Sequence, residues 1–157
     1  MEQASYNTNK PIVAIVGRPN VGKSTLYNRL TGSRHSIVSD ESGTTRDRII
    51  SDTTWGNKLF TLIDTGGIDL FESNILWTEV RNQIDDAIEE CDVVILLVDA
   101  SVGITNPDQE VAEIIRLSNK PVVLAASKSD NDERVLNASE LYELGLGTPI
   151  PISAYHN

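Results

Sequence analysis

The sequence has too few cysteines and too short apolar runs for several classes of protein. Its single cysteine, Cys91, excludes an intrachain disulfide and leaves too few thiols for a zinc cage. The longest apolar run covers only residues 93–98, whereas a membrane-spanning helix needs about 18 or more. Residues 1–10 are polar and do not form a secretory signal. We therefore expect a soluble, cytoplasmic protein, and the length of 157 residues is typical of one domain.

Basic residues are also scarce, and the net charge is −10. This charge argues against broad binding of nucleic acid or of an anionic membrane. The charge is uneven, because residues 1–48 hold seven Lys or Arg against four acids, a net of +3, and the remainder holds six against nineteen, a net of −13. A basic segment within an acidic domain favours a compact anionic ligand such as phosphate, with chance clustering as the alternative.

Apolar strands alternate with helices along the chain, which predicts an α/β fold. We expect a mostly parallel six-stranded sheet with one antiparallel strand pair and helices on both faces. The expected strands cover residues 11–16, 49–55, 59–63, 93–98 and 121–126, with a last strand from Ile150. The expected helices cover residues 21–31, about five turns from Leu76 to Cys91, a helix from Asn106, and 137–144, and residues 33–48 are expected to form a loop.

The start of one helix and the role of the cysteine follow from local patterns. Asn106 is a favourable N-cap, Pro107 suits the first helical position, and Gln109 stands where a capping-box partner belongs. Cys91 closes the apolar stripe of the preceding helix, so we interpret it as a small core residue rather than a reactive thiol.

The segment Gly17–Ser24, GRPNVGKS, fits the phosphate-loop pattern G-x-x-x-x-G-K-[ST] between a strand and a helix. Its glycines allow backbone N–H groups to turn toward phosphates, and the helix N-terminus adds partial positive charge. Lys23 can reach the β- and γ-phosphates, and the Ser24 hydroxyl can bind Mg²⁺. The pattern in this setting predicts a nucleotide phosphate site.

Two further segments have the positions expected of a nucleotide–magnesium site. Asp64 follows a predicted strand and can hold a magnesium-bound water, and the N–H of Gly67 can contact a γ-phosphate. A threonine of the segment 43–47, GTTRD, can complete the metal shell. Taken alone, the first segment would more often be a simple turn, and the second could be an ordinary polar loop.

A guanine site is predicted where later strands end. The carboxylate of Asp130 can accept hydrogen bonds from guanine N1–H and its exocyclic amine, which adenine does not offer. Lys128 can lay its aliphatic stem over the base, and a backbone N–H at Ser153 or Ala154 can point at the guanine O6. In isolation, the segment 127–130 is better interpreted as a solvated loop, and its place behind the phosphate-loop pattern favours the guanine site.

The combined motifs resemble the first GTP-binding domain of the EngA/Der family. They are IVGRPNVGKSTLYNRL, GTTRDR, DTGGI, AIEECDVVILLVDA and LYELGLGTPIPISA, and they cover almost all of residues 11–156. The resemblance implies a GTPase domain at residues 11–157 after a flexible tail at 1–10. It also implies a parent protein with two such domains and a KH-like domain, which assists assembly of the large ribosomal subunit. Ribosomal or rRNA contacts would then belong to domains absent from this chain, with no membrane partner.

The resemblance also implies a role for individual residues. Phosphates and metal would be held by Gly17, Asn20, Val21, Gly22, Lys23, Ser24 and Thr25. Thr45 would bind Mg²⁺ with Ser24 and Asp64, Gly67 would belong to the second switch, and Asp130 would recognise guanine. Lys23, Asn20, Thr45 and Gly67 would act in catalysis.

This sequence departs from the family or from other GTPases at three places. Ile68 replaces the water-orienting glutamine of Ras-like proteins, so a K⁺ ion bound by Asn20 is expected to stabilise the transition state. Ser127 replaces a family asparagine that contacts guanine N7 and braces the phosphate loop, so nucleotide affinity is expected to be lower. The family's terminal helix is not present in this sequence, so one sheet face is expected to be partly uncovered.

Two other functions stay open from the sequence. One is a nucleotide-binding module with little or no hydrolysis, which Ser127, Ile68 and the missing helix would allow. The other is a phosphate-loop ATPase or nucleotide kinase, against which Asp130 argues. Tighter binding of ADP than of GDP would favour the ATPase or kinase. Single-turnover hydrolysis of bound GTP distinguishes the binding module from a GTPase.

Overall fold

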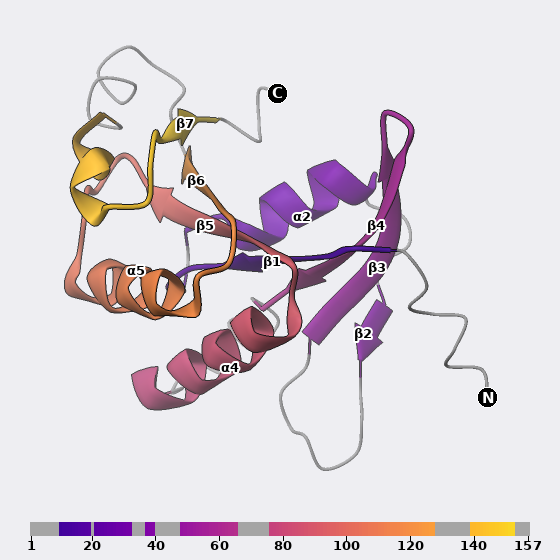
Figure 1. Cartoon of the computed structure of the whole chain (residues 1–157), viewed down its shortest axis with the longest axis horizontal. Coiled ribbons are helices and arrows are strands. Elements are labelled where there is room, and N and C mark those ends of the chain that lie inside the picture. Colours follow the sequence, from indigo (N-terminus) through magenta and orange to yellow (C-terminus); the bar gives the residue numbers. More distant parts are fainter. Residues whose placement is uncertain are drawn as a thin grey trace.

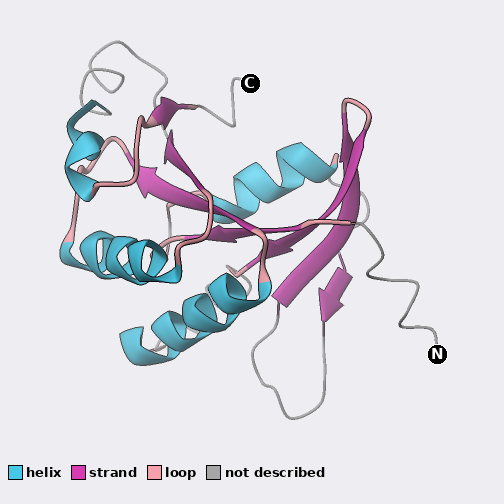
Figure 2. Ribbon diagram, in the orientation of Figure 1, coloured by secondary structure: helices cyan, strands magenta, loops and turns pink. Residues whose placement is uncertain are grey.

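The computed structural model describes residues 10–19, 21–32, 37–39, 48–65, 76–127 and 139–152. Strands and helices alternate along the chain except over residues 37–64, where three strands follow one another (Figures 1 and 2). The elements are β1 (Ile12–Val16), α2 (Lys23–Thr31), β2 (Ile37–Ser39), β3 (Arg48–Trp55), β4 (Lys58–Asp64), α4 (Trp77–Glu90), β5 (Val93–Asp99), α5 (Asn106–Ser118), β6 (Val122–Ser127), the 3-10 helix η1 (Ser139–Leu144) and β7 (Ile150–Pro151).

The strands form one sheet in the order β2-β3-β4-β1-β5-β6-β7. The β4, β1, β5, β6 and β7 strands are parallel, and β3 is antiparallel to β4 across the two-residue turn at 56–57. The predicted fold class is confirmed. The sheet has seven strands rather than six, because β2 pairs antiparallel with the outer edge of β3 and makes a second antiparallel pair. With three residues, β2 is too short to produce a recognisable period in the segment expected to be a loop.

The bounds of three helices differ from the expectation, and the first of them, α2, begins at Lys23 rather than at residue 21. The α4 helix has 14 residues, about four turns rather than five, because Leu76 and Cys91 are its extended caps and not part of it. The N-cap of α5 is Thr105, not Asn106, and its capping-box partner is Asp108, not Gln109. The Thr105 hydroxyl accepts a hydrogen bond from the Asp108 N–H at 3.3 Å, and the Asp108 carboxylate accepts one from the Thr105 N–H at 2.9 Å.

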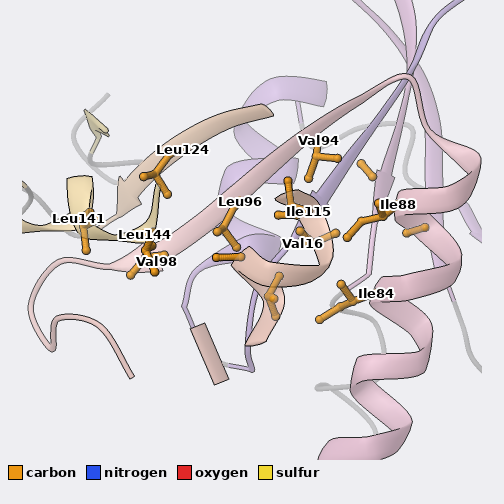
Figure 3. Packing of buried hydrophobic residues seen from close by; sticks show 14 of the residues in the cluster. Val16, Ile84, Ile88, Val94, Leu96, Val98, Ile115, Leu124, Leu141 and Leu144 are labelled. Carbon is orange, nitrogen blue, oxygen red and sulfur yellow. The ribbon is translucent and has the colours of Figure 1, made fainter. Parts of the chain in front are cut away.

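The larger core lies between the sheet and the α4, α5 and η1 helices. It contains Val16, Ile84, Leu96, Ile115 and Leu141 among others, and Figure 3 shows these side chains gathered between the sheet and the helices. Cys91 belongs to this cluster and is 2% exposed, as predicted for a core residue. The apolar side chains of α4 and α5 recur every three to four residues, which directs them to one helix face.

The opposite face of the sheet is covered less completely. Among the described helices only α2 packs there, through Tyr27 against Ile15 and Leu62. Farther along this face, Val93 and Ile95 are half-buried and Val123 is exposed. This agrees with the partly uncovered face expected from the sequence. In the described part of the chain, no helix has the length and apolar character needed to cross a membrane.

Candidate functional site

The predicted phosphate loop begins where β1 ends. Because β1 lies between β4 and β5 in the sheet, the carboxyl ends of the parallel strands converge there. Gly17 directly follows β1, Asp64 is the last residue of β4, and Ser127 is the last residue of β6. Three segments that are far apart in the sequence therefore meet at one edge of the sheet, as expected for a ligand site in a parallel α/β fold.

Two glycines give the loop its course. Gly17 has a φ of 157°, and a Cβ added there would lie 2.6 Å from the carbonyl oxygen of Leu97. Gly22 has a φ of 104° and is the N-cap of α2. Any other residue at Gly17 would clash with β5, and one at Gly22 would be strained. The loop thus passes close to β5 and enters α2 through Gly22.

Lys23 lies in the first turn of α2, and its side chain folds back into the loop. Its ammonium donates hydrogen bonds to the carbonyl oxygens of Gly17, at 3.1 Å, and Arg18, at 2.8 Å. The residue is only 4% exposed. These bonds hold one positive charge inside the curve of the loop, where an anionic ligand would be attracted.

The candidate metal ligands occupy two neighbouring elements. Ser24 is half-buried in the first turn of α2, and Asp64 is fully buried, in register with Ile15 of β1. The chain after Asp64 is fixed to the same strand, because the Thr65 hydroxyl donates to the Ile15 carbonyl at 3.0 Å. One hydroxyl and one carboxylate at this edge are oxygen donors, the ligand type that Mg²⁺ prefers.

Ser127, the last residue of β6, connects this strand to the phosphate loop. Its hydroxyl oxygen lies 2.7 Å from the carbonyl oxygen of Val21 and 3.2 Å from that of Val98. A hydroxyl has one proton, so the shorter contact, to Val21, is the hydrogen bond. The serine therefore braces the phosphate loop, and its proton is used in that bond rather than offered to a base.

The structure brings together eight of the predicted site residues. They are Gly17, Val21, Gly22, Lys23, Ser24, Thr25, Asp64 and Ser127. The other predicted residues lie outside the described part of the chain. They are Asn20, Thr45, Gly67, Lys128, Asp130, Ser153 and Ala154.

Sequence reasoning missed one buried acid next to this site. Asp108 of α5 is fully buried, and its Oδ1 lies 3.5 Å from Nε of Arg18 in the phosphate loop. The pair is 90 positions apart in the sequence, and neither residue stands out by local pattern.

A separate cavity of about 640 Å³ lies away from the phosphate loop. It is lined by the start of β1 and the β3–β4 hairpin, including Lys10, Val13 and Phe60. Val13 and Phe60 face the α2 side of the sheet, so this cavity is part of the less covered face.

The family of 50S ribosome-binding GTPases matches residues 12–128, about three-quarters of the chain and all of the site described above. This chain belongs to that family. It is also 53% identical over 146 residues to the GTPase Der of Limosilactobacillus fermentum, which confirms the resemblance to the EngA/Der GTPases. The match covers 93% of this chain and 33% of that protein, so the chain spans about one-third of the length of the curated relatives it matches.

Solved structures of related GTP-binding proteins support the same assignment for the fold. Aquifex aeolicus Era, bound to GDP and AlF₄⁻, is 33% identical with a TM-score of 0.73, over 96% of this chain and 53% of that one. A second Era structure, in complex with MgGDPNP and a segment of 16S ribosomal RNA, is 34% identical with a TM-score of 0.73 and the same coverage. The phosphate loop described here is therefore the phosphate loop of a GTPase domain.

Proposed function

We propose that this chain is a GTP-binding domain that hydrolyses GTP to GDP and phosphate. The observation that carries the proposal is the buried Lys23 ammonium, held by two loop carbonyls at the sheet edge where Asp64 ends its strand. The match to a family of GTPases indicates that the nucleotide bound by this loop is a guanine nucleotide. The parent protein would act in assembly of the large ribosomal subunit, as a longer chain with a second such domain.

The residues of this chain would have separate roles in binding the phosphates and the guanine base. Loop amides and Lys23 would bind the β- and γ-phosphates and offset the charge that develops as water attacks the γ-phosphorus and the bond to the β–γ bridging oxygen breaks. Asp130 would select guanine, assisted by Lys128 and the backbone at Ser153 and Ala154. The amide of Gly67 would contact the γ-phosphate.

Ser24 and Asp64 fit a Mg²⁺ ion by their donor atoms, and Thr45 would complete the set. When bound, this ion would neutralise charge on the β- and γ-phosphate oxygens. Support for Mg²⁺ comes from the related Era structure, which holds MgGDPNP.

The first experiment is titration of the purified chain with GDP and separately with ADP, in Mg²⁺ and K⁺. We expect GDP to bind and ADP not to bind, because only guanine satisfies the Asp130 carboxylate. Tighter binding of ADP would overturn the assignment of a guanine nucleotide. Single-turnover conversion of bound GTP then tests hydrolysis, and a chain that binds GTP without converting it would be a binding module.

The K⁺ dependence is a further part of the proposal and rests on Asn20 together with Ile68, both outside the described residues. Isoleucine has no group that orients water. We therefore expect a K⁺ ion to stabilise the transition-state charge in place of a water-orienting side chain. We expect faster single-turnover hydrolysis in KCl than in NaCl at matched ionic strength. Equal rates in the two salts would exclude this role of K⁺.

A further inference from the structure

The fully buried carboxylate of Asp108 is placed between a helix cap and the phosphate loop. Its Oδ2 accepts hydrogen bonds from the N–H and the hydroxyl of Thr105, each at 2.9 Å. The bond from the Thr105 N–H is one half of the capping box of α5, and both bonds use the same carboxylate oxygen. The second oxygen, Oδ1, is not needed for the cap.

That second oxygen faces the phosphate loop. It lies 3.5 Å from Nε of Arg18, and within the described residues neither of these buried atoms has a hydrogen bond. The Arg18 side chain is 18% exposed and that of Asp108 is fully buried. Arg18 also donates through Nη1 to the Pro19 carbonyl at 3.4 Å, and the Asp108 carboxylate is the acid paired with its Nε. Removing one charge of a buried pair leaves the other uncompensated, which is unfavourable.

Arg18 in turn is connected to the phosphate-binding lysine. Its carbonyl oxygen accepts a hydrogen bond from the Lys23 ammonium at 2.8 Å, which is shorter than the bond from that ammonium to the Gly17 carbonyl. The loop around Arg18 begins and ends at glycines with positive φ, Gly17 and Gly22, which restrict the backbone little by themselves. An anchored Arg18 side chain therefore limits where its own carbonyl, and hence the ammonium, lies.

We propose that Asp108 is a positioning residue for the phosphate loop, acting through Arg18 on Lys23. The inference rests on the proposed function, because it takes Lys23 as the group that contacts the nucleotide phosphates. The α5 helix is rigidly packed in the larger core through Val111, Ala112 and Ile115. The ion pair fastens the loop to that fixed point, so the ammonium is preorganised before a nucleotide arrives.

The test compares GDP dissociation from the unsubstituted chain, Asp108→Asn and Glu113→Gln. An asparagine oxygen can still accept the Thr105 bonds, so the cap is kept while the charge facing Arg18 is removed. We expect dissociation to be roughly tenfold faster in D108N, as for loss of one charge-assisted contact. Glu113 is an exposed α5 residue paired with Arg116, so E113Q is expected to release GDP at the original rate.

Thermal unfolding separates positioning from a purely structural role. A purely structural role would lower the Tm but leave the rate of GDP dissociation from the folded protein unchanged. A GDP dissociation rate for D108N within twofold of that of the unsubstituted chain would overturn the inference. Arg18→Gln tests the pair from its other side and replaces D108N if that variant does not fold. The variant that carries both Arg18→Gln and Asp108→Asn is expected to release GDP no faster than either single variant, because each substitution breaks the same contact.

The two proposals fail in different ways. If the unsubstituted chain does not bind GDP, the proposed function falls and this inference falls with it. If it binds GDP and the variants release it at the original rate, only the positioning role falls.

Discussion

Ser127 stands where the related GTPases are expected to have asparagine, and its hydroxyl donates to the Val21 carbonyl at 2.7 Å. The site is 6% exposed, so water replaces this donor poorly. Ser127→Ala is therefore expected to lower the free energy of unfolding by about 1–2 kcal/mol and to weaken GDP binding. Urea unfolding and GDP titration measure the two effects. An unchanged unfolding midpoint would show that the brace contributes nothing.

Cys91 gives a second prediction for a single side chain. Burial raises the pKa of its thiol, and its Sγ donates to the Ile88 carbonyl at 3.4 Å. Because the thiolate is the reactive form, labelling by a disulfide reagent at pH 8 is expected to be more than about tenfold slower in the native chain than in urea. Equal labelling rates would indicate that this end of α4 opens readily. The control is a free thiol of a short peptide under both conditions.

The predicted site could be assembled from sequence where its signal is local. The sequence predicted that the phosphate loop and Asp64 lie at one sheet edge, because each follows or ends a strand. The carboxyl ends of neighbouring parallel strands meet at that edge. The brace by Ser127 and the pair of Arg18 with Asp108 were not predictable, since both join residues about 90 to 106 positions apart. The effect of Ser127 on the base contact stays a prediction, whereas its hydroxyl does reach the phosphate loop.

At the scale of elements, predictions from periodicity located every described long strand and helix, and the errors lie at their ends. Thr105 outcompetes Asn106 as the cap because Asp108 completes a reciprocal pair of hydrogen bonds with it. The choice depends on the side chain three residues farther on, which single-residue preferences do not include. The β2 strand was missed because its pairing with β3 is tertiary and its three residues show no period.

The corrected cap of α5 can be tested with two alanine variants. Thr105→Ala removes the acceptor for the Asp108 N–H and is expected to cost about 1 kcal/mol, or a Tm lower by about 2–4 °C. Asn106→Ala changes an exposed residue inside the helix and is expected to be nearly neutral. Thermal unfolding followed by circular dichroism compares the two. A larger loss for the Asn106 variant would favour the cap first predicted from the sequence.

At the scale of the whole molecule, an ion pair connects the segment before β1 to β3, which lies beyond β4 in the sheet. The Lys10 ammonium donates to Oδ2 of Asp52 on β3 at 2.7 Å, and the Thr61 hydroxyl of β4 donates to Oδ1 at 2.8 Å. Chiefly through the hydrogen bond from Lys10, the pKa of Asp52 is lowered from its usual value. These contacts connect the segment before β1 with the β3–β4 hairpin.

The sign of the resulting pH dependence follows from that lowered pKa. Stabilisation by the Asp52 carboxylate is complete above its unfolded pKa, about 3.9, and is lost as the pH falls through the lower folded pKa. Asp52→Asn is expected to destabilise the chain at pH 7 by no more than about 1 kcal/mol, because the side chain is 52% exposed and water screens the pair. The difference from the unsubstituted chain should shrink below about pH 4 and in high salt, since protonation and screening remove the same attraction. Urea unfolding at pH 7 and pH 3 measures it, and a difference that grows on acidification would contradict the assignment of this carboxylate as the stabilising partner of Lys10.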